Sequence, residues 1–279
     1  MLPLETIAHQ TASTCNIDTD EVLAKLTMYA NESRITLALI LPYLSKKQRI
    51  LEIGAGLCFT SLFLKSEGFQ ITALEPAIGG FDIFDQLKSS ILAKFESLQL
   101  NMLSIPAQEL NPAEHGYFDL IFSNNVIEHI PHWHDALTAM SSVLSAHGTM
   151  RHACPNYSVP YEPHYGIPVF RVAPQLSKRL FLSKTADLDI WNSLNFITCS
   201  QVKQFCKSRH LTCHFEGELL YNALRRVDDD PLFSERHQGI VATLARFIMR
   251  SGLGKIIRRI PPSMATPMIF NIHHQRKIS

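Results

Sequence analysis

Glu52, Gly54 and Gly56 stand where a strand-like segment ends and a helix-like segment begins. Glu52 closes an apolar run at residues 50–51, and the two glycines follow one residue apart. Glycines at this spacing allow a tight turn and the close approach of a ligand to bare backbone, and the following helix offers N–H groups at its start. A carboxylate at position 52 would repel a pyrophosphate but attract an ammonium or a sulfonium group. The stretch therefore predicts a loop that binds a cationic nucleotide cofactor.

A second acid follows about twenty residues later, a spacing typical of nucleotide-binding sheets. Glu75 ends the apolar run at residues 71–74. At the tip of a neighbouring parallel strand, such a carboxylate can bind both hydroxyls of a ribose. Two strand-end acids and a two-glycine turn therefore form one candidate nucleotide site.

In these stretches the chain resembles the class I S-adenosylmethionine-dependent methyltransferases of the small-molecule type. The matching motifs are residues 51–56, 73–76, 105–110 and 117–130, in that order, and the resemblance covers about residues 48–156. It implies S-adenosyl-L-methionine as the cofactor. The cofactor-binding positions that it implies are Glu52, Gly54, Ala55, Gly56, Glu75, Pro76, Gln108 and Asn124.

Four residues bear on the match to the family pattern. Cys58 stands where a third small residue is frequent, which is tolerable if this position only packs the helix on the strand. Ala107 and Gln108 stand where many relatives carry an acid before the alanine, so adenine recognition would rest on backbone and on Gln108. Asn124 has an alternative role as a helix cap.

Short apolar segments alternate with segments of helical periodicity along the chain. This alternation predicts an α/β fold: a doubly wound, Rossmann-like, mostly parallel sheet with helices on both faces, an N-terminal helical cap and a C-terminal helical extension. The nearly continuous apolar run at 118–123 is typical of a strand covered on both faces. Strands are expected at about residues 50–53, 71–74, 100–104, 118–123, 149–154 and 211–216, and further helices at about 81–97, 133–145 and 200–208.

Three parts are expected along the chain. Residues 1–47 form the N-terminal helical cap, residues 48–218 the cofactor-binding methyltransferase domain with a substrate-loop insertion at 156–198, and residues 219–279 a basic helical extension. In the cap, we expect an extended or partly ordered lead at residues 1–18 and two helices, at about 18–31 and 33–44. Asp18 and Glu21 have the spacing of a capping box at the start of the first helix.

The acceptor side is expected in the segment 156–174, which is rich in proline and tyrosine and leaves the carboxyl end of a central strand. Ligands of open α/β sheets bind outside those ends, so Tyr161, Glu162 and Tyr165 are candidate substrate-binding residues. The alternative interpretation is a structural crossover whose aromatic rings only pack.

His129 and His164 are the candidate catalytic residues. Imidazole suits proton removal near neutral pH, and a base is needed only if the acceptor must lose a proton. The alternative is that either histidine is a surface or capping residue, because 13 histidines in the chain make chance placement common.

The composition, 46% hydrophobic and 18% charged, is that of a folded chain with a sizeable core. Its six cysteines include no Cys-x-x-Cys pair, so we expect no metal and interpret the thiols as reduced core residues. The N-terminal residues lack the basic region and apolar core of a signal peptide, and no apolar run is long enough to span a bilayer. The expected location is the cytoplasm.

The C-terminal region is basic although the formal net charge is only +1. Residues 236–279 contain eight Lys and Arg residues and no Asp or Glu, and the basic residues interleave with apolar ones. This pattern predicts either a terminal helical hairpin with a solvated basic face or peripheral contact with an anionic membrane or a phosphorylated substrate. No recognition-helix or base-stacking pattern accompanies the charge, so we expect no nucleic-acid partner. The oligomeric state stays open.

The leading hypothesis is transfer of a methyl group to a small-molecule acceptor, with a saccharide or a lipid-linked compound as the specific suggestion. In-line displacement at a sulfonium methyl needs alignment and exclusion of water more than acid catalysis. One alternative is a non-catalytic S-adenosylmethionine-binding or scaffold protein. Another is a nicotinamide-dependent oxidoreductase, which Glu52 and the stretch 124–129 argue against.

Overall fold

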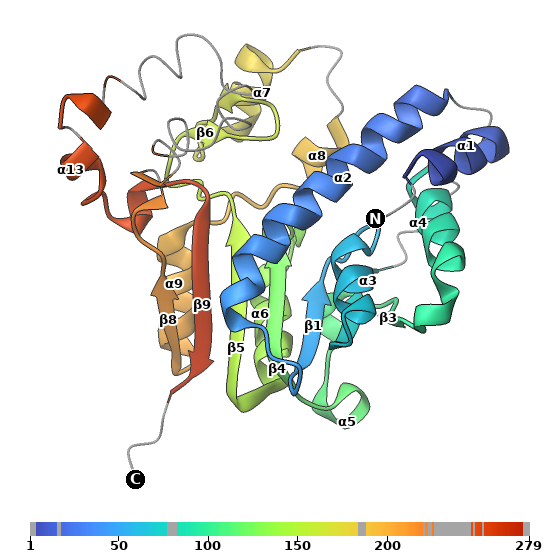
Figure 1. Cartoon of the computed structure of the whole chain (residues 1–279). Helices are drawn as coiled ribbons and strands as arrows, with labels where there is room; N and C mark the ends of the chain where they lie inside the picture. The colour runs from blue at the N-terminus through green and yellow to red at the C-terminus, as the bar shows by residue number, and fades with distance from the viewer. Residues whose placement is uncertain are drawn as a thin grey trace. The chain divides into compact units, whose positions relative to one another are not determined.

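A mostly parallel sheet of seven strands positions the predicted cofactor residues (Figure 1), whereas Tyr161 and Glu162 lie in a separate two-stranded sheet. The computed structural model describes residues 4–15, 18–76, 83–183, 188–219, 221–222, 225, 247, 249–252 and 254–275. The strands, in spatial order, are β3 (Asn101–Leu103), β2 (Gln70–Leu74), β1 (Arg49–Ile53), β4 (Phe118–Asn124), β5 (Leu144–Cys154), β9 (Met268–His274) and β8 (Leu211–Phe215). The predicted fold class is confirmed.

The chain forms two compact units. The first comprises Met1–Val126 and His132–Arg151, and the second comprises Ile127–Pro131 and His152–Ser279. The boundary falls within β5, so this strand contributes residues to both units.

In the first unit, β1 pairs in parallel with β2 and with β4, and β2 pairs in parallel with β3. In β1 and β2 the four residues after the first are all buried, as expected for parallel strands covered on both faces. The register aligns Glu52 with Ala73 on one side and with Phe122 on the other. The acid at the end of β1 therefore lies in the middle of the parallel sheet.

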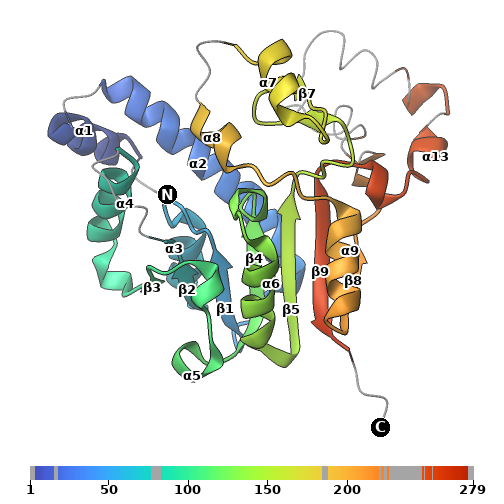
Figure 2. The ribbon, with the colours of Figure 1, turned by 180° about the vertical axis from the view of Figure 1, so that it is seen from behind.

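The helices of the first unit cover both faces of its strands. The long helix α2 passes in front of the sheet in Figure 1, whereas α6 stands in front of β4 in the reverse view of Figure 2. The helices are α1 (Leu4–Cys15), α2 (Thr19–Ile40), η1 (Leu41–Tyr43), α3 (Phe59–Ser66), α4 (Ile83–Lys94), η2 (Glu96–Leu98), η3 (Ala107–Glu109), α5 (Pro112–His115) and α6 (Trp133–Ser142).

The N-terminal cap differs from its prediction in two ways. The part of the lead that the structure describes includes a helix, α1, and the two predicted cap helices are one continuous helix, α2. The polar residues at 31–33 do not interrupt α2, because they lack the glycine or proline that would end it. The predicted start is confirmed: the Asp18 carboxylate accepts hydrogen bonds from the N–H groups of Asp20 (2.8 Å) and Glu21 (3.1 Å).

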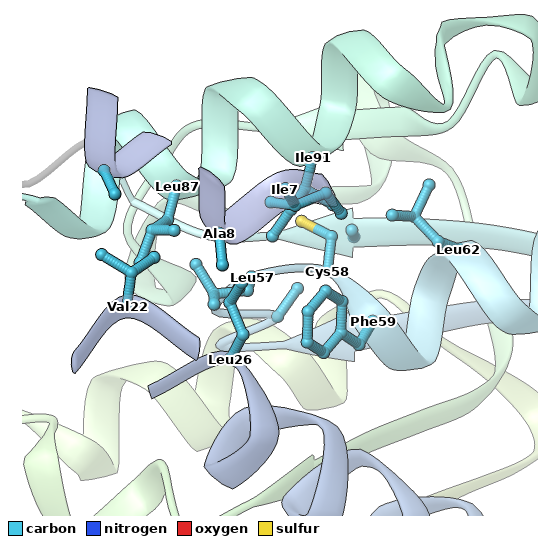
Figure 3. Close-up of a cluster of buried hydrophobic side chains, with 13 residues drawn as sticks. Ile7, Ala8, Val22, Leu26, Leu57, Cys58, Phe59, Leu62, Leu87 and Ile91 are labelled. Atoms are coloured by element: carbon cyan, nitrogen blue, oxygen red, sulfur yellow. The ribbon is translucent and has the colours of Figure 1, made fainter. Parts of the chain in front are cut away.

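A hydrophobic cluster joins the cap helices to the glycine turn (Figure 3). Cys58 is fully buried in it, and its thiol lies 3.7 Å from the sulfur of Met102. Side chains of α1, α2, α4, β2, the glycine turn and the residues after it make up the cluster: Ile7, Ala8, Ala12, Val22, Leu26, Ala55, Leu57, Cys58, Phe59, Leu62, Ala73, Leu87 and Ile91. Cys58 therefore packs in the core, as expected if a residue larger than the usual small one is tolerated at this position.

The second unit contains β8 and β9, which pair antiparallel, and a two-stranded hairpin of β6 (Tyr161–Glu162) and β7 (Ile167–Pro168). This hairpin lies inside the segment that we expected to be an irregular loop. The helices are η4 (Ile127–His129), α7 (Pro174–Phe181), α8 (Leu188–Ser193), α9 (Cys199–Ser208), α13 (Gly254–Ile257) and η5 (Pro262–Met264). The second unit thus gathers its helices from segments far apart in the sequence.

Two boundaries predicted from sequence are wrong. Helix α6 ends at Ser142 and β5 already begins at Leu144. Residues 146–148, which lie between the predicted helix and the predicted strand, are therefore part of the strand. Gly148 instead marks a close approach, because a Cβ there would lie 3.0 Å from the carbonyl oxygen of Phe118. The strand β9 was not predicted at all, since residues 268–274 fall in the expected helical extension.

Most of the basic helix expected near residues 240–260 lies outside the described residues; within them, this stretch contains the short α13. Within the described part of the chain, every helix is too short or too polar to cross a bilayer.

Candidate active site

The site begins with Glu52, whose carboxylate is almost fully buried near the end of β1. The Ser61 hydroxyl at the start of α3 donates a hydrogen bond to it. Burial raises the pKa of Glu52 to about 8, and the hydrogen bonds from Ser61 and Thr60 only partly oppose this effect. Without a positive partner, Glu52 is therefore largely protonated at neutral pH.

The glycine turn is held by backbone hydrogen bonds to the end of β2. The N–H groups of Gly54 and Ala55 donate to the Leu74 carbonyl, at 2.8 and 3.1 Å, and the Gly56 N–H donates to the Glu75 carboxylate at 2.8 Å. Gly54 and Gly56 both have positive φ, +68° and +54°. A Cβ at Gly54 would also lie 2.5 Å from a methyl group of Val126. The turn is thus already ordered, and its three N–H groups are bonded within the protein.

Glu75 fixes this turn with one carboxylate oxygen and is itself half-buried. Burial raises the pKa of Glu75, while the hydrogen bond from Gly56 and the positive charge of Lys88 lower it in part. Because only Oε2 bonds the turn, the second oxygen is the atom suited to a ribose diol.

Helix α2 contributes two hydroxyl groups to this region that the sequence did not single out. The Ser33 hydroxyl lies 2.9 Å from that of Thr60, one residue before Ser61. The side-chain amide of Asn124, at the end of β4, donates to the Thr36 hydroxyl at 3.1 Å. The sequence does show a serine and a threonine about one helical turn apart, which places both hydroxyls on one face of α2. Their hydrogen-bond partners lie far away in sequence, so this spacing alone does not reveal their role. Asn124 is therefore positioned by α2.

The remaining predicted cofactor residues lie at the same ends of the strands. Pro76 follows Glu75 after β2 and is half-buried, as is Gln108 in η3, which follows β3. The structure thus brings all eight predicted cofactor residues into the first unit, at or just after the carboxyl ends of β1, β2, β3 and β4.

The candidate acceptor residues form a second group, in the second unit. The His164 ring nitrogen Nδ1 lies 2.6 Å from the Glu162 carboxylate, and the His129 and His164 rings pack edge to face with centroids 5.2 Å apart. Nδ1 of His129 lies 2.7 Å from the hydroxyl of Ser193 in α8. The two predicted catalytic histidines are therefore neighbours, each oriented by a further polar side chain.

Glu162 is completely buried and serves as the anchor of this group. It accepts hydrogen bonds from the Tyr157 hydroxyl (3.2 Å) and from the Tyr165 N–H (2.9 Å), as well as from His164. Burial alone would raise the pKa of Glu162, but the hydrogen bonds from His164 and Tyr165 outweigh it and lower the pKa. Glu162 is an ionised residue that positions His164.

The electrostatics of His129 favour its neutral form. Burial, with a smaller contribution from His164, lowers the pKa of His129 to about 4, although Glu162 opposes the shift. At neutral pH this imidazole is therefore uncharged, and one ring nitrogen keeps a lone pair that can bind a cation.

The two tyrosines predicted to bind substrate differ in their surroundings. Tyr165 packs beside Trp191, and its hydroxyl oxygen accepts a hydrogen bond from the backbone N–H of Trp191 at 3.0 Å. Tyr161 is 42% exposed in β6. Tyr165 is partly buried, so Tyr161 offers the larger exposed surface to a ligand.

A hollow of about 410 Å³ lies elsewhere in the first unit, at the amino ends of the strands. It is lined by residues that include Arg49, Gln70 and Asn101, which begin β1, β2 and β3. Because ligands of open parallel sheets bind at the carboxyl ends, we do not assign the cofactor to this hollow.

Five of the six cysteine side chains lie within the described part of the chain. Cys58, Cys154, Cys199 and Cys206 are buried and Cys213 is partly buried, which is consistent with the predicted packing role.

These features define a class I methyltransferase fold: a Rossmann-like sheet, a two-glycine turn after β1 and acids at the ends of β1 and β2. A model of the methyltransferase domain matches residues 28–224, and the chain belongs to this family. The predicted family and enzyme class are confirmed, which excludes the nicotinamide-dependent oxidoreductase.

Two uncharacterized proteins of Mycobacterium tuberculosis, from strains CDC 1551 and H37Rv, are similar to this chain. Each is 35% identical over 204 residues, which cover 70% of this chain and 68% of the relative.

Among solved structures, the CcbJ methyltransferase of Streptomyces caelestis is similar in fold, with a TM-score of 0.53 at 12% identity over 88% of this chain and 90% of that one. A phosphoethanolamine N-methyltransferase of Haemonchus contortus, in complex with S-adenosylhomocysteine, has a TM-score of 0.48 and 15% identity; the match covers 88% of this chain. It covers only 53% of the Haemonchus contortus enzyme, so this chain spans about half of that protein's length.

Proposed function

We propose that the protein transfers a methyl group from S-adenosyl-L-methionine to a small-molecule acceptor. The observation that carries this proposal is the buried Glu52, beside a glycine turn that Glu75 holds in place. A buried acid with a raised pKa is suited to a ligand that brings its own positive charge.

The residues of the first unit fit this cofactor. Glu52 would bind its ammonium group, Glu75 its ribose hydroxyls and Gln108 its adenine, while Asn124 would contact the methionine portion. Gly54 and Gly56 allow close approach because they carry no side chain, and their positive φ angles disfavour any residue that has a Cβ. Ala55 and Pro76 complete the walls. When bound, the cofactor supplies a sulfonium methyl group and leaves as a neutral thioether.

His129 and His164 are proposed to act on the acceptor. A hydroxyl acceptor must lose a proton as its bond to the methyl group forms, and an ammonium acceptor must lose one beforehand to expose its lone pair; imidazole can take that proton. The ionised Glu162 would stabilise the imidazolium formed at His164, since the two groups are 2.6 Å apart. Glu162 thereby acts as a positioning residue, and Tyr161 and Tyr165 are the proposed substrate contacts.

The acceptor class is proposed from the same residues. The exposed ring of Tyr161 suits a saccharide or a lipid-linked acceptor, because aromatic rings pack on apolar faces while neighbouring polar groups bind hydroxyls. Incubation with S-adenosylmethionine and fractionated metabolite or lipid pools would identify the acceptor by the mass increase of one methyl group.

Replacing Glu52 by Gln tests the cofactor assignment. The amide keeps the shape but cannot carry charge, so we expect S-adenosylhomocysteine affinity to fall about 10- to 100-fold, corresponding to a lost charged hydrogen bond. Calorimetric titration measures this, and Glu67→Gln on the exposed end of α3 is the matched control. Unchanged affinity in Glu52→Gln, or no binding by the wild-type chain at millimolar ligand, would refute the assignment.

A non-catalytic cofactor-binding or scaffold protein is the second candidate. It retains the first-unit residues but needs no acceptor chemistry from His129 or His164. Tight cofactor binding, together with no methyl transfer to any acceptor pool, would favour it over the enzyme.

We also propose peripheral contact with an anionic membrane surface, in keeping with a cytoplasmic location. The basic C-terminal region motivates this, and α7 adds exposed Leu176 and Leu180 beside Lys178 and Arg179. Truncation of the C-terminal region is unsuitable as a test, because it would remove β9. Co-sedimentation with anionic and neutral vesicles should instead compare the wild type with a variant carrying Arg246→Gln, Arg250→Gln and Lys255→Gln; equal binding would exclude the basic segment.

A further inference from the structure

Three side chains of the second unit bring metal-ligating atoms together. Glu128, His129 and His164 each offer one ligand atom, and these atoms lie within 4.8 Å of one another. The carboxylate of Glu128 is buried, whereas the two imidazoles are partly exposed. Because His129 and His164 come from separate segments, no spacing in the sequence signals the group, and we had expected no metal.

The hydrogen bonds around His129 fix its tautomer. Ser193 has one hydroxyl hydrogen, which it donates to the Ile190 carbonyl oxygen at 2.8 Å. Its oxygen must therefore accept the hydrogen of His129 Nδ1 at 2.7 Å. In the neutral imidazole this leaves the lone pair on Nε2, which lies 3.9 Å from the Glu128 carboxylate. His129 thus presents a ligand nitrogen beside a carboxylate.

His164 is oriented in the same way. Its Nδ1 donates to Glu162, which is itself held by Tyr157 and Tyr165, so Nε2 is the nitrogen that a metal would bind. Histidine ligands of metals almost always donate their second ring N–H to a carboxylate, carbonyl or similar acceptor. Both histidines of this cluster have that outer partner.

We propose that Glu128, His129 and His164 form a binding site for one divalent transition-metal ion of the zinc class. Two imidazole nitrogens and one carboxylate oxygen suit Zn²⁺ or Co²⁺, whereas Mg²⁺ and Ca²⁺ prefer oxygen ligands. Zinc ligands lie about 2.0–2.2 Å from the ion, so small rotations of the partly exposed rings must close the cluster. Three protein ligands leave a fourth position for water or for an acceptor oxygen, the arrangement typical of a catalytic rather than a structural zinc site.

This inference deepens the proposed function and rests on it only for the role of the fourth position. In the metal-bound form the imidazoles are ligands, and an acceptor oxygen would be activated by coordination instead of by a free base. Metal binding itself depends on the second unit alone.

Metal titration of the full-length chain tests the proposal. After treatment with a chelator, we expect one equivalent of Co²⁺ to give the visible absorption of nitrogen and oxygen coordination without a thiolate charge-transfer band, and Zn²⁺ to displace it. His129→Gln and His164→Gln should each weaken binding at least 100-fold, and Glu162→Gln about 10- to 100-fold through the outer partner. His147→Ala, an exposed histidine of β5, is the matched control.

Circular dichroism and the melting shift with S-adenosylhomocysteine establish that each variant is folded. The metal site would be overturned if the wild-type chain did not bind Co²⁺. It would also be overturned if His129→Gln and His164→Gln bound Co²⁺ as tightly as His147→Ala. Either result would count even with cofactor binding intact. Loss of cofactor binding by a wild-type chain that still binds Co²⁺ would instead overturn the proposed function and leave the metal site standing.

Discussion

Glu52 couples cofactor binding to a proton. Its pKa is raised to about 8 by burial, and an ammonium group beside it would favour the ionised form. Binding should then release a proton, so S-adenosylhomocysteine affinity should rise by up to about tenfold per pH unit between about pH 6 and pH 8. Titration calorimetry in buffers of different ionisation enthalpy measures both effects. A flat pH profile in the wild type, or an unchanged slope in Glu52→Gln, would contradict the coupling.

The raised pKa of Glu52 also affects the pH dependence of stability in the protein without cofactor, where stability falls as pH rises. A carboxyl whose folded pKa lies above its unfolded value binds more protons when folded. Its contribution to stability is present below the unfolded pKa and is lost as pH rises toward about 8. Cofactor binding reverses this trend.

Comparing Gly54 with Gly68 distinguishes the backbone strain of adding a Cβ from the steric clash that it makes. Both have positive φ, +68° and +81°, but a Cβ at Gly54 would lie 2.5 Å from Val126, whereas at Gly68 nothing lies within 4 Å. Gly68→Ala should cost about 1–2 kcal/mol from the backbone alone, and Gly54→Ala about 1–3 kcal/mol more from the clash. Chemical denaturation measures the difference. Equal losses would mean that Val126 moves aside without penalty.

Residue types at the cofactor site were predictable because turn geometry and charge restrict them. Glu52, Gly54, Gly56 and Glu75 were identified in this way. The hydroxyl of Thr36 was not, because its role depends on a partner at position 124, which only the folded chain brings near.

Asn156 ties three segments of the second unit together. Its completely buried amide donates to the carbonyls of Ser263 (3.1 Å) and Ala265 (2.9 Å) and accepts from the N–H of Cys199 (3.1 Å). Asn156→Ala would leave these buried backbone groups unbonded, so we expect a loss of about 2–4 kcal/mol. Thermal melting and urea denaturation measure it. The exposed Asn192→Ala serves as the control, and comparable stability in the two variants would contradict the structural role.

Elements with strong local signals were predicted, and those fixed by distant contacts were not. Strand β4 is a nearly continuous apolar run, and α9 begins at a complete capping box formed by Thr198 and Gln201. Strand β9 lacks such a local signal. It is positioned by pairing with β8, which lies more than fifty residues earlier in the sequence. Helix α1 is stabilised by packing on α2 and α4, which composition alone does not reveal.

At the scale of the whole chain, the two proposed sites belong to different units. The cofactor residues lie in the first unit, and Glu128, His129 and His164 lie in the second. We therefore expect His164→Gln to leave S-adenosylhomocysteine affinity within about twofold of the wild type, and Glu52→Gln to leave Co²⁺ affinity similarly unchanged. Calorimetry on both variants tests this. A shift of tenfold or more in either would show that the sites are energetically coupled.

The position of β9 has a consequence for how the chain is made. This strand lies between β5 and β8, yet it leaves the ribosome after every other described strand. Once β8 has been synthesised, about fifty further residues must follow before its neighbour exists, which takes roughly 3–10 s at usual translation rates. During that interval β8, which carries the apolar side chains of Leu211 and Phe215, has not yet paired with β9. Nascent chains halted within this window should therefore be preferred targets for chaperones.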